Sequence, residues 1–161
     1  MSEIGDKIQS KCLAFGDRII RLNDYLLEQA ACRKPEGRSQ KDDNRRSKSL
    51  TTSVLPQTSR VPVHLQAIAT LCNQLLRSGT SIGANNAEAT NAISDTDYRS
   101  KSFIALKEAR ESLYWIQLLH RNGYIDDKQF ESIHDDCEEL LKILVTRCKK
   151  MNDVIEEKSK K

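Results

Sequence analysis

One Glu-x-x-His pair is the arrangement in this sequence that comes nearest to metal chemistry. Glu131 and His134 have the spacing that places a carboxylate and an imidazole on one face of a helix. Di-iron bundles need two such pairs, together with a glutamate from each of the other two helices. The sequence has a single copy, and neither Glu108 nor Glu111 has a histidine three residues later. With no glycine-rich phosphate loop and no recognisable nucleophile and base either, we predict a protein that is not an enzyme, with no catalytic residues, no metal and no cofactor.

Phosphate binding is the second chemistry that the residues could support. The 161-residue chain carries a formal net charge of +3, and residues 33–60 hold eight Lys or Arg against three Asp or Glu. This segment therefore carries a net charge of +5, and the rest of the chain carries −2. Because the segment has few apolar residues, we predict a long basic loop at about 33–61. The loop is either a nucleic-acid contact or a solvated tether, since it lacks aromatic residues for base stacking. The candidate nucleic-acid-binding residues are Arg38, Arg45, Arg46 and Lys48 in the loop and, near the C-terminus, Lys149 and Lys150.

Composition indicates one ordinary domain in a reducing compartment. Apolar residues make up 38% of the chain and charged residues 30%, which is typical of a soluble domain. The N-terminal residues lack the apolar core of a signal peptide, and no run approaches the roughly 18 apolar residues of a membrane span. Five cysteines without a C-x-x-C pair are expected to be free thiols, four of them on apolar helix faces. We therefore expect a cytoplasmic protein without a membrane partner.

Apolar residues recur at spacings of three and four on both sides of the basic segment, which predicts helices. Four are expected, at about 4–31, 63–91, 95–121 and 127–157. Ser94 and Asp126 are suited to cap the third and fourth helices, and Gly123 is a natural stop for the third. Because no segment shows the period of two that strands require, residues 1–161 are predicted to form a single all-α domain, an antiparallel up-and-down four-helix bundle.

The expected second helix contains glycines, which lower the stability of a helix. Gly79, Gly83 and Ala87 recur every four residues, and each interior glycine costs a helix about 1 kcal/mol relative to alanine. We predict that they form a smooth ridge along which another helix approaches closely. Small polar residues also recur at threes and fours, on the side turned away from the apolar face. They are either a solvated surface or a second contact surface.

The third helix favours a contact surface. Leu106, Ala109 and Ile116 lie on one apolar stripe, while a second stripe on another side includes Glu111 and Trp115. One four-helix domain can cover only one of these stripes, so the surplus stripe predicts self-association. Its glutamates should pair with residues of the second helix, within or between subunits. The predicted oligomer interface consists of Arg77, Ser81, Asn85, Glu88, Glu108, Glu111 and Trp115.

Two stretches carry a family resemblance. LLRSGTSIGANNAEA at 75–89, followed by FIALKEARESLYWIQLL at 103–119, resembles the signatures of four-helix bundle proteins encoded in the intervening sequences of bacterial 23S ribosomal RNA genes. The resemblance covers roughly residues 65–145 and implies a left-handed bundle that assembles into a ring-like homopentamer. The same family is similar to the accessory proteins of diversity-generating retroelements, which bind nucleic acid and a reverse transcriptase. The matching positions are Arg77, Ser78, Gly79, Ser81, Gly83, Asn85, Glu88, Lys107, Glu108, Glu111 and Trp115. The basic loop is longer than the family pattern.

Two functions from different classes remain open. The first is an oligomeric protein that binds ribosomal RNA through the basic loop and the C-terminal lysines, where a pentamer would multiply weak contacts. The alternative is an oligomeric scaffold for a protein partner, with incidental affinity for RNA. Charge reversal at Arg45 and Arg46 separates them, because it should abolish RNA binding and spare a protein partner.

Overall fold

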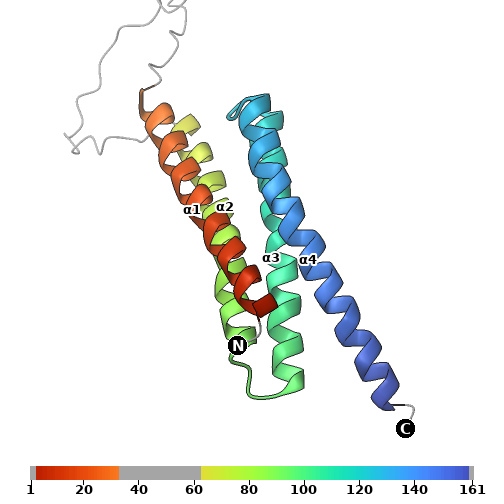
Figure 1. The fold of residues 1–161 in the computed structure, drawn as a ribbon. Coiled ribbons are helices and arrows are strands. Elements are labelled where there is room, and N and C mark those ends of the chain that lie inside the picture. Colours follow the sequence, from red (N-terminus) through yellow and green to blue (C-terminus); the bar gives the residue numbers. More distant parts are fainter. Residues whose placement is uncertain (1–2, 33–62, 160–161) are drawn as a thin grey trace, which may run out of the picture.

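Four helices run alternately up and down in the computed structural model, which describes residues 3–32 and 63–159. They are α1 (Glu3–Cys32), α2 (Val63–Thr90), α3 (Asp95–Arg121) and α4 (Asp127–Ser159), and no strand occurs among the described residues. Successive helices point in opposite directions, so the start of α1, the α2–α3 connection and the end of α4 lie at the same end (Figure 1). The prediction of an all-α protein with bundled helices is confirmed. The expected basic loop lies outside the described residues.

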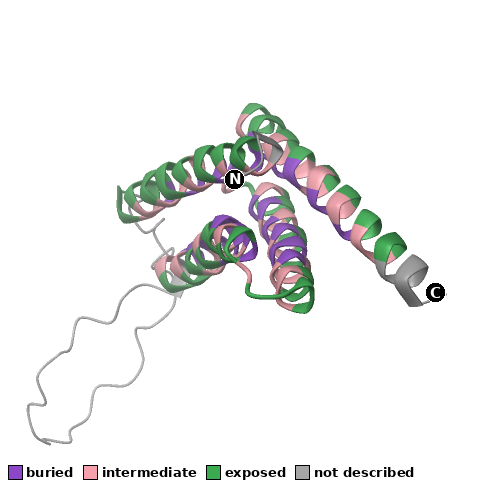
Figure 2. Ribbon diagram, turned by 60° about the horizontal axis from the view of Figure 1, so that its bottom comes forward, coloured by how far each residue is buried: buried purple, intermediate pink, exposed green. Residues whose placement is uncertain are grey.

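The apolar stripes read from the sequence form the core. Phe15 and Ile19 of α1, Ile82 of α2 and Ile116 of α3 are among the large side chains that are fully buried, and the buried faces of the helices turn toward one another (Figure 2). The fourth helix adds an uninterrupted stripe at helical spacing, consisting of Ile133, Cys137, Leu140, Leu144 and Cys148. Each helix therefore folds because one of its faces leaves water.

Local capping residues fix where α3 and α4 begin and where α3 ends. The Ser94 side chain accepts a hydrogen bond from the Asp97 amide at 3.1 Å. Asp126 and Gln129 cap α4 reciprocally, since each side chain accepts from the backbone N–H of the other residue at 2.7 and 3.1 Å. Gly123 has a φ of 69°, the left-handed conformation that ends many helices and that favours glycine. These predicted capping residues are confirmed.

Helices α1 and α2 approach each other at the glycines of α2. A Cβ atom on Gly79 would lie 3.0 Å from Cγ1 of Ile19, and one on Gly83 would lie 3.4 Å from Cβ of Cys12. Both glycines are buried. The distance at Gly79 is shorter than most real Cβ contacts, and the one at Gly83 is a van der Waals contact. The prediction that another helix packs closely on these glycines is confirmed, and that helix is α1.

The bundle is not equally closed on all sides. Helix α2 packs extensively against both α1 and α3, and α3 against α4, whereas α1 and α4 share the least contact. Two ion pairs bridge this seam, Lys11 with Glu139 at 2.8 Å and Arg18 with Asp136. The C-terminal turns of α4 diverge from the other helices (Figure 1). The α1–α4 seam is therefore the open side of the bundle.

Four of the five cysteines are buried, as their positions on apolar helix faces predicted. Cys12, Cys72, Cys137 and Cys148 are buried free thiols, and Cys32 is an exposed one. Burial raises the pKa of Cys12 and Cys72 to about 11 and that of Cys137 to about 12, so these thiols stay protonated at neutral pH. Within the described part of the chain, no helix combines the length and apolar composition that a membrane crossing requires.

The close contact at Gly79 predicts that replacing this glycine by leucine lowers stability, whereas the same substitution at Gly16 does not. Gly79→Leu should lower the free energy of unfolding by about 1–3 kcal/mol, because the new side chain overlaps Ile19. Gly16→Leu is the control: no atom lies within 4 Å of its Cβ position, so a better helix former should leave stability unchanged or raise it. Urea unfolding followed by circular dichroism, at one protein concentration, measures both. Equal stabilities for the two variants would contradict the close approach.

Candidate functional site

The predicted nucleic-acid residues fall into two groups. Arg38, Arg45, Arg46 and Lys48 lie outside the described residues. Lys149 and Lys150 are exposed on the last third of α4. The described structure therefore places one of the two basic groups, at the end of the bundle where α4 diverges (Figure 1).

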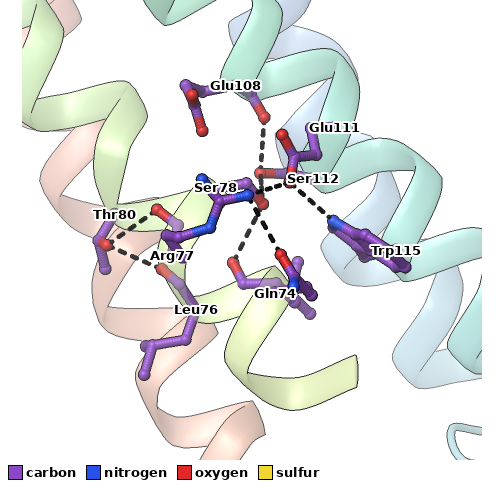
Figure 3. A network of polar contacts seen from close by, with 10 residues as sticks. Gln74, Leu76, Arg77, Ser78, Thr80, Glu108, Glu111, Ser112 and Trp115 are labelled. Carbon is purple, nitrogen blue, oxygen red and sulfur yellow. Dashed lines mark hydrogen bonds and ion pairs between the residues drawn. The ribbon is translucent and has the colours of Figure 1, made fainter. Parts of the chain in front are cut away.

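The predicted contact between the polar sides of α2 and α3 exists within one chain. Arg77 Nη2 lies 2.7 Å from Glu111 Oε1 and also donates to Gln74 Oε1 at 3.1 Å. Trp115 Nε1 donates to the same Glu111 oxygen at 3.2 Å, so the glutamate joins the two helices (Figure 3). Each partner sits one turn from the next along its helix, which brings all of them to one side.

A buried hydroxyl pair lies directly beneath this network. Ser78 Oγ and Ser112 Oγ are 2.9 Å apart, and both residues are fully buried. The hydroxyls also lie within hydrogen-bonding distance of the Leu75 and Glu108 carbonyls, at 3.3 and 2.9 Å. Serine is small enough for α2 and α3 to approach, and its hydroxyl is satisfied locally. The sequence pattern had placed neither serine in this pair.

Among the polar residues between α2 and α3, which we call the α2–α3 surface, Glu108 has a side chain that is not fully hydrogen-bonded. Its Oε2 atom is buried and has no hydrogen-bond partner among the described residues. Partial burial raises the pKa of this carboxyl above its ordinary value, the neighbouring Glu111 raises it further, and Arg77 opposes both effects. A buried carboxylate oxygen without a hydrogen bond lowers the stability of the folded protein.

The remaining residues of the predicted interface lie farther along the same two helices. Asn85 Nδ2 donates to the Ser81 carbonyl at 2.9 Å, and Glu88 forms an ion pair with Lys101. Both Ser81 and Asn85 are half-buried. The second stripe of α3 is also half-buried along its whole length, at Ile104, Glu108, Glu111, Trp115 and Leu118. The single chain thus covers this surface only in part.

The sequence did not predict a basic groove that lies at the end of the bundle where α4 diverges from the other helices, which we call the open end. Arg147, which sits half-buried on α4, donates from Nη1 to Asn86 Oδ1 at 2.7 Å, and its guanidinium lies 5.9 Å from the centre of the Tyr98 ring. A groove of about 530 Å³ is lined by Arg147, Tyr98 and Lys150, among others. The available signal was the stretch 140–152, which has four basic residues and no acidic one.

The histidine of the Glu-x-x-His pair belongs to an aromatic cluster. His134 lies against Phe130, with ring centres 4.8 Å apart, and Phe130 stacks on His120 at 4.1 Å. His120 Nε2 is 2.7 Å from the Asp127 carboxylate. No group of three or more potential metal ligands occurs in residues 3–32 and 63–159.

The fold defines a four-helix bundle protein, and comparison with known proteins places it in a family. The family model for the 23S rRNA-intervening sequence protein matches residues 44–146. A solved protein of unknown function, from the S23 ribosomal protein family of Bacteroides thetaiotaomicron, is 33% identical. The match covers 91% of this chain and 98% of that one, with a TM-score of 0.66. No curated protein matches. The chain belongs to the 23S rRNA-intervening sequence protein family.

Glu108 predicts a pH dependence of stability. A carboxyl whose pKa is raised by folding binds more protons in the folded state, so its contribution to stability falls as pH rises through the raised value. Glu108→Gln should remove this dependence and match or exceed the wild-type melting temperature at pH 7. Thermal unfolding of both proteins between about pH 4 and pH 7 measures it. Exposed Glu131→Gln is the control, and a Glu108→Gln curve parallel to wild type would contradict the assignment.

Proposed function

We propose that this protein is a non-enzymatic homo-oligomer that binds ribosomal RNA in the cytoplasm. The observation that carries the proposal is the stretch Leu140–Asn152 of α4, where four basic side chains occur without an acidic one. Arg99, from the start of α3, adds a further cation at the same end through its hydrogen bond to Asn152 at 3.0 Å. Clustered cations attract phosphates and release counterions when they bind.

Two further facts support RNA as the partner. The family is named for proteins of 23S ribosomal RNA intervening sequences, so such RNA is the natural first ligand to test. The segment 33–60 carries a net +5 by sequence, and it adds candidate phosphate contacts to those of α4. A scaffold for a protein partner is the outcome to consider if RNA binding fails.

The oligomer is supported by the α2–α3 surface. Trp115 is half-buried, and the Glu108 carboxylate keeps an oxygen that is buried and unpartnered within the described chain. Partly exposed tryptophans are enriched at protein interfaces, and a partner subunit would offer the Glu108 oxygen a hydrogen-bond donor. The proposed assembly is the ring-like pentamer that the family resemblance implies.

RNA binding is tested by titrating the purified protein with the stem of a 23S ribosomal RNA intervening sequence and with a scrambled hairpin of equal length. We expect tighter binding to the cognate stem, and a preference that persists at physiological salt. The double variant Arg45→Glu and Arg46→Glu should weaken binding and leave the fold unchanged, because it reverses charge without removing apolar side chains. Equal affinity for both hairpins, lost together as salt rises, would reduce the binding to generic attraction.

The oligomer is tested by measuring native mass with light scattering. Trp115→Ala and Glu111→Ala should each shift the mass toward that of a single chain, since both remove groups from the proposed interface. Tyr114→Ala is the matched control, because Tyr114 is the exposed aromatic neighbour of Trp115. If both interface variants keep the wild-type mass, the contact between subunits lies on another surface.

A further inference from the structure

We infer that the groove at the open end of the bundle binds a short stretch of single-stranded RNA, with a phosphate held between Arg147 and Lys150. This inference rests on the proposed RNA-binding function and gives it a site. The groove lies where the start of α1, the start of α3 and the part of α4 between Glu139 and Lys150 meet. It is lined by Ile8, Tyr98, Ile143, Arg147 and Lys150, among others. Its volume of about 530 Å³ is within the range of ligand pockets.

The charge of Arg147 is held in place but is not neutralised. Arginines that are fully buried in proteins are normally paired with a carboxylate, and half-buried Arg147 loses part of its solvation in the same way. Here the hydrogen-bond partner is the neutral amide of Asn86, which is fully buried and in turn donates to Gln9 Oε1. Within the described residues, Arg147 forms no ion pair. The Asn86 contact therefore fixes the guanidinium and leaves its positive charge, and most of its five N–H donors, for a ligand.

The other charged groups of the groove leave a net positive site. Lys142 is paired with Glu138 at 2.8 Å, and Glu139 is paired with Lys11 at 2.8 Å. These two pairs cancel locally. Lys150 is exposed one turn beyond Arg147 and, among the described residues, it also forms no ion pair. Two cations spaced by one helical turn on one side of a groove suit an anionic oxygen cluster such as a phosphate.

The walls of the groove favour a single strand over a duplex. Tyr98 lies beside Arg147, and the isoleucines Ile8 and Ile143 add apolar surface. An aromatic ring and apolar side chains next to cations accept an unstacked base, while the cations take the adjoining phosphate. A duplex keeps its bases stacked inside the helix, so only its phosphates could reach this groove.

The sharpest test compares two adjacent lysines. Lys150 lines the groove, whereas Lys149 is exposed next to it on α4 and is not part of the groove lining. Lys149→Gln and Lys150→Gln change the net charge equally, so generic attraction predicts equal effects. The probe is a labelled single-stranded RNA of about 10 nucleotides, measured by fluorescence anisotropy at several salt concentrations, alone and as a duplex.

We expect Lys150→Gln to weaken single-strand binding by roughly tenfold and to lower the salt slope by about 0.7, the value for one phosphate contact on a single strand. Lys149→Gln, which removes the same charge beside the groove, should weaken binding by no more than about twofold, which is its share of the general attraction to phosphates. Tyr98→Leu should weaken single-strand binding by roughly tenfold without changing the salt slope, because it removes a ring and no charge. The duplex should respond less than the single strand to Lys150→Gln, because only its phosphates reach the groove, and it should not respond to Tyr98→Leu, because its bases stay stacked.

Three outcomes would overturn the inference. Equal weakening by Lys149→Gln and Lys150→Gln would mean a diffuse basic surface, and an unchanged affinity for Tyr98→Leu would remove the base contact. Tighter binding of the duplex would assign the groove to phosphates alone. Each of these results leaves the proposed RNA-binding function standing. Absence of wild-type binding to any RNA would instead overturn both proposals. Arg147→Gln can be measured as a further variant. If Arg147→Gln fails to fold, the Lys150→Gln and Tyr98→Leu results still decide whether the groove binds a single strand.

Discussion

The arrangement of the whole bundle depends on how closely α2 lets its neighbours approach. Gly79 and Gly83 bring the backbone of α2 against Ile19 and Cys12 of α1, and Ser78 brings it against Ser112 of α3. Small residues on two sides of one helix make α2 the central element, since a larger side chain on either side would separate a pair of helices. The helix-forming cost of two glycines is offset by the dispersion contacts that close packing adds.

Tight packing around α2 leaves the opposite seam open. Helices α1 and α4 share the least contact, and exposed ion pairs such as Lys11–Glu139 bridge them. Such pairs contribute about 0–1 kcal/mol each, so they orient the helices more than they stabilise the fold. Because α4 diverges from the other helices toward its C-terminal end (Figure 1), Arg147 and Lys150 line a groove rather than a closed core.

The two proposed surfaces are built by different means. On the α2–α3 side, Glu111 accepts hydrogen bonds from both Arg77 and Trp115, so most polar groups are satisfied within the chain (Figure 3). The partly exposed Trp115 ring and one oxygen of Glu108 remain without a full set of contacts. At the open end, Arg147 is fixed by a neutral amide and keeps its charge. The first composition suits a protein neighbour of the same kind, and the second suits an anion. An oligomer could therefore use both surfaces at once.

The amino-acid sequence alone was enough to predict the helices, the capping residues of α3 and α4 and the glycine ridge of α2. Apolar spacing, Ser94, Asp126 and Gly123 act over one or two helical turns, and such short-range chemistry is readable without coordinates. It also indicated that Arg77 and Glu111 would meet, because their helices are neighbours along the chain. Only the tertiary structure joined Asn86 to Arg147, 61 residues apart, and showed that this arginine has a neutral partner. Such contacts depend on how far α4 diverges from the bundle, which is set by packing among all four helices and not by any local pattern.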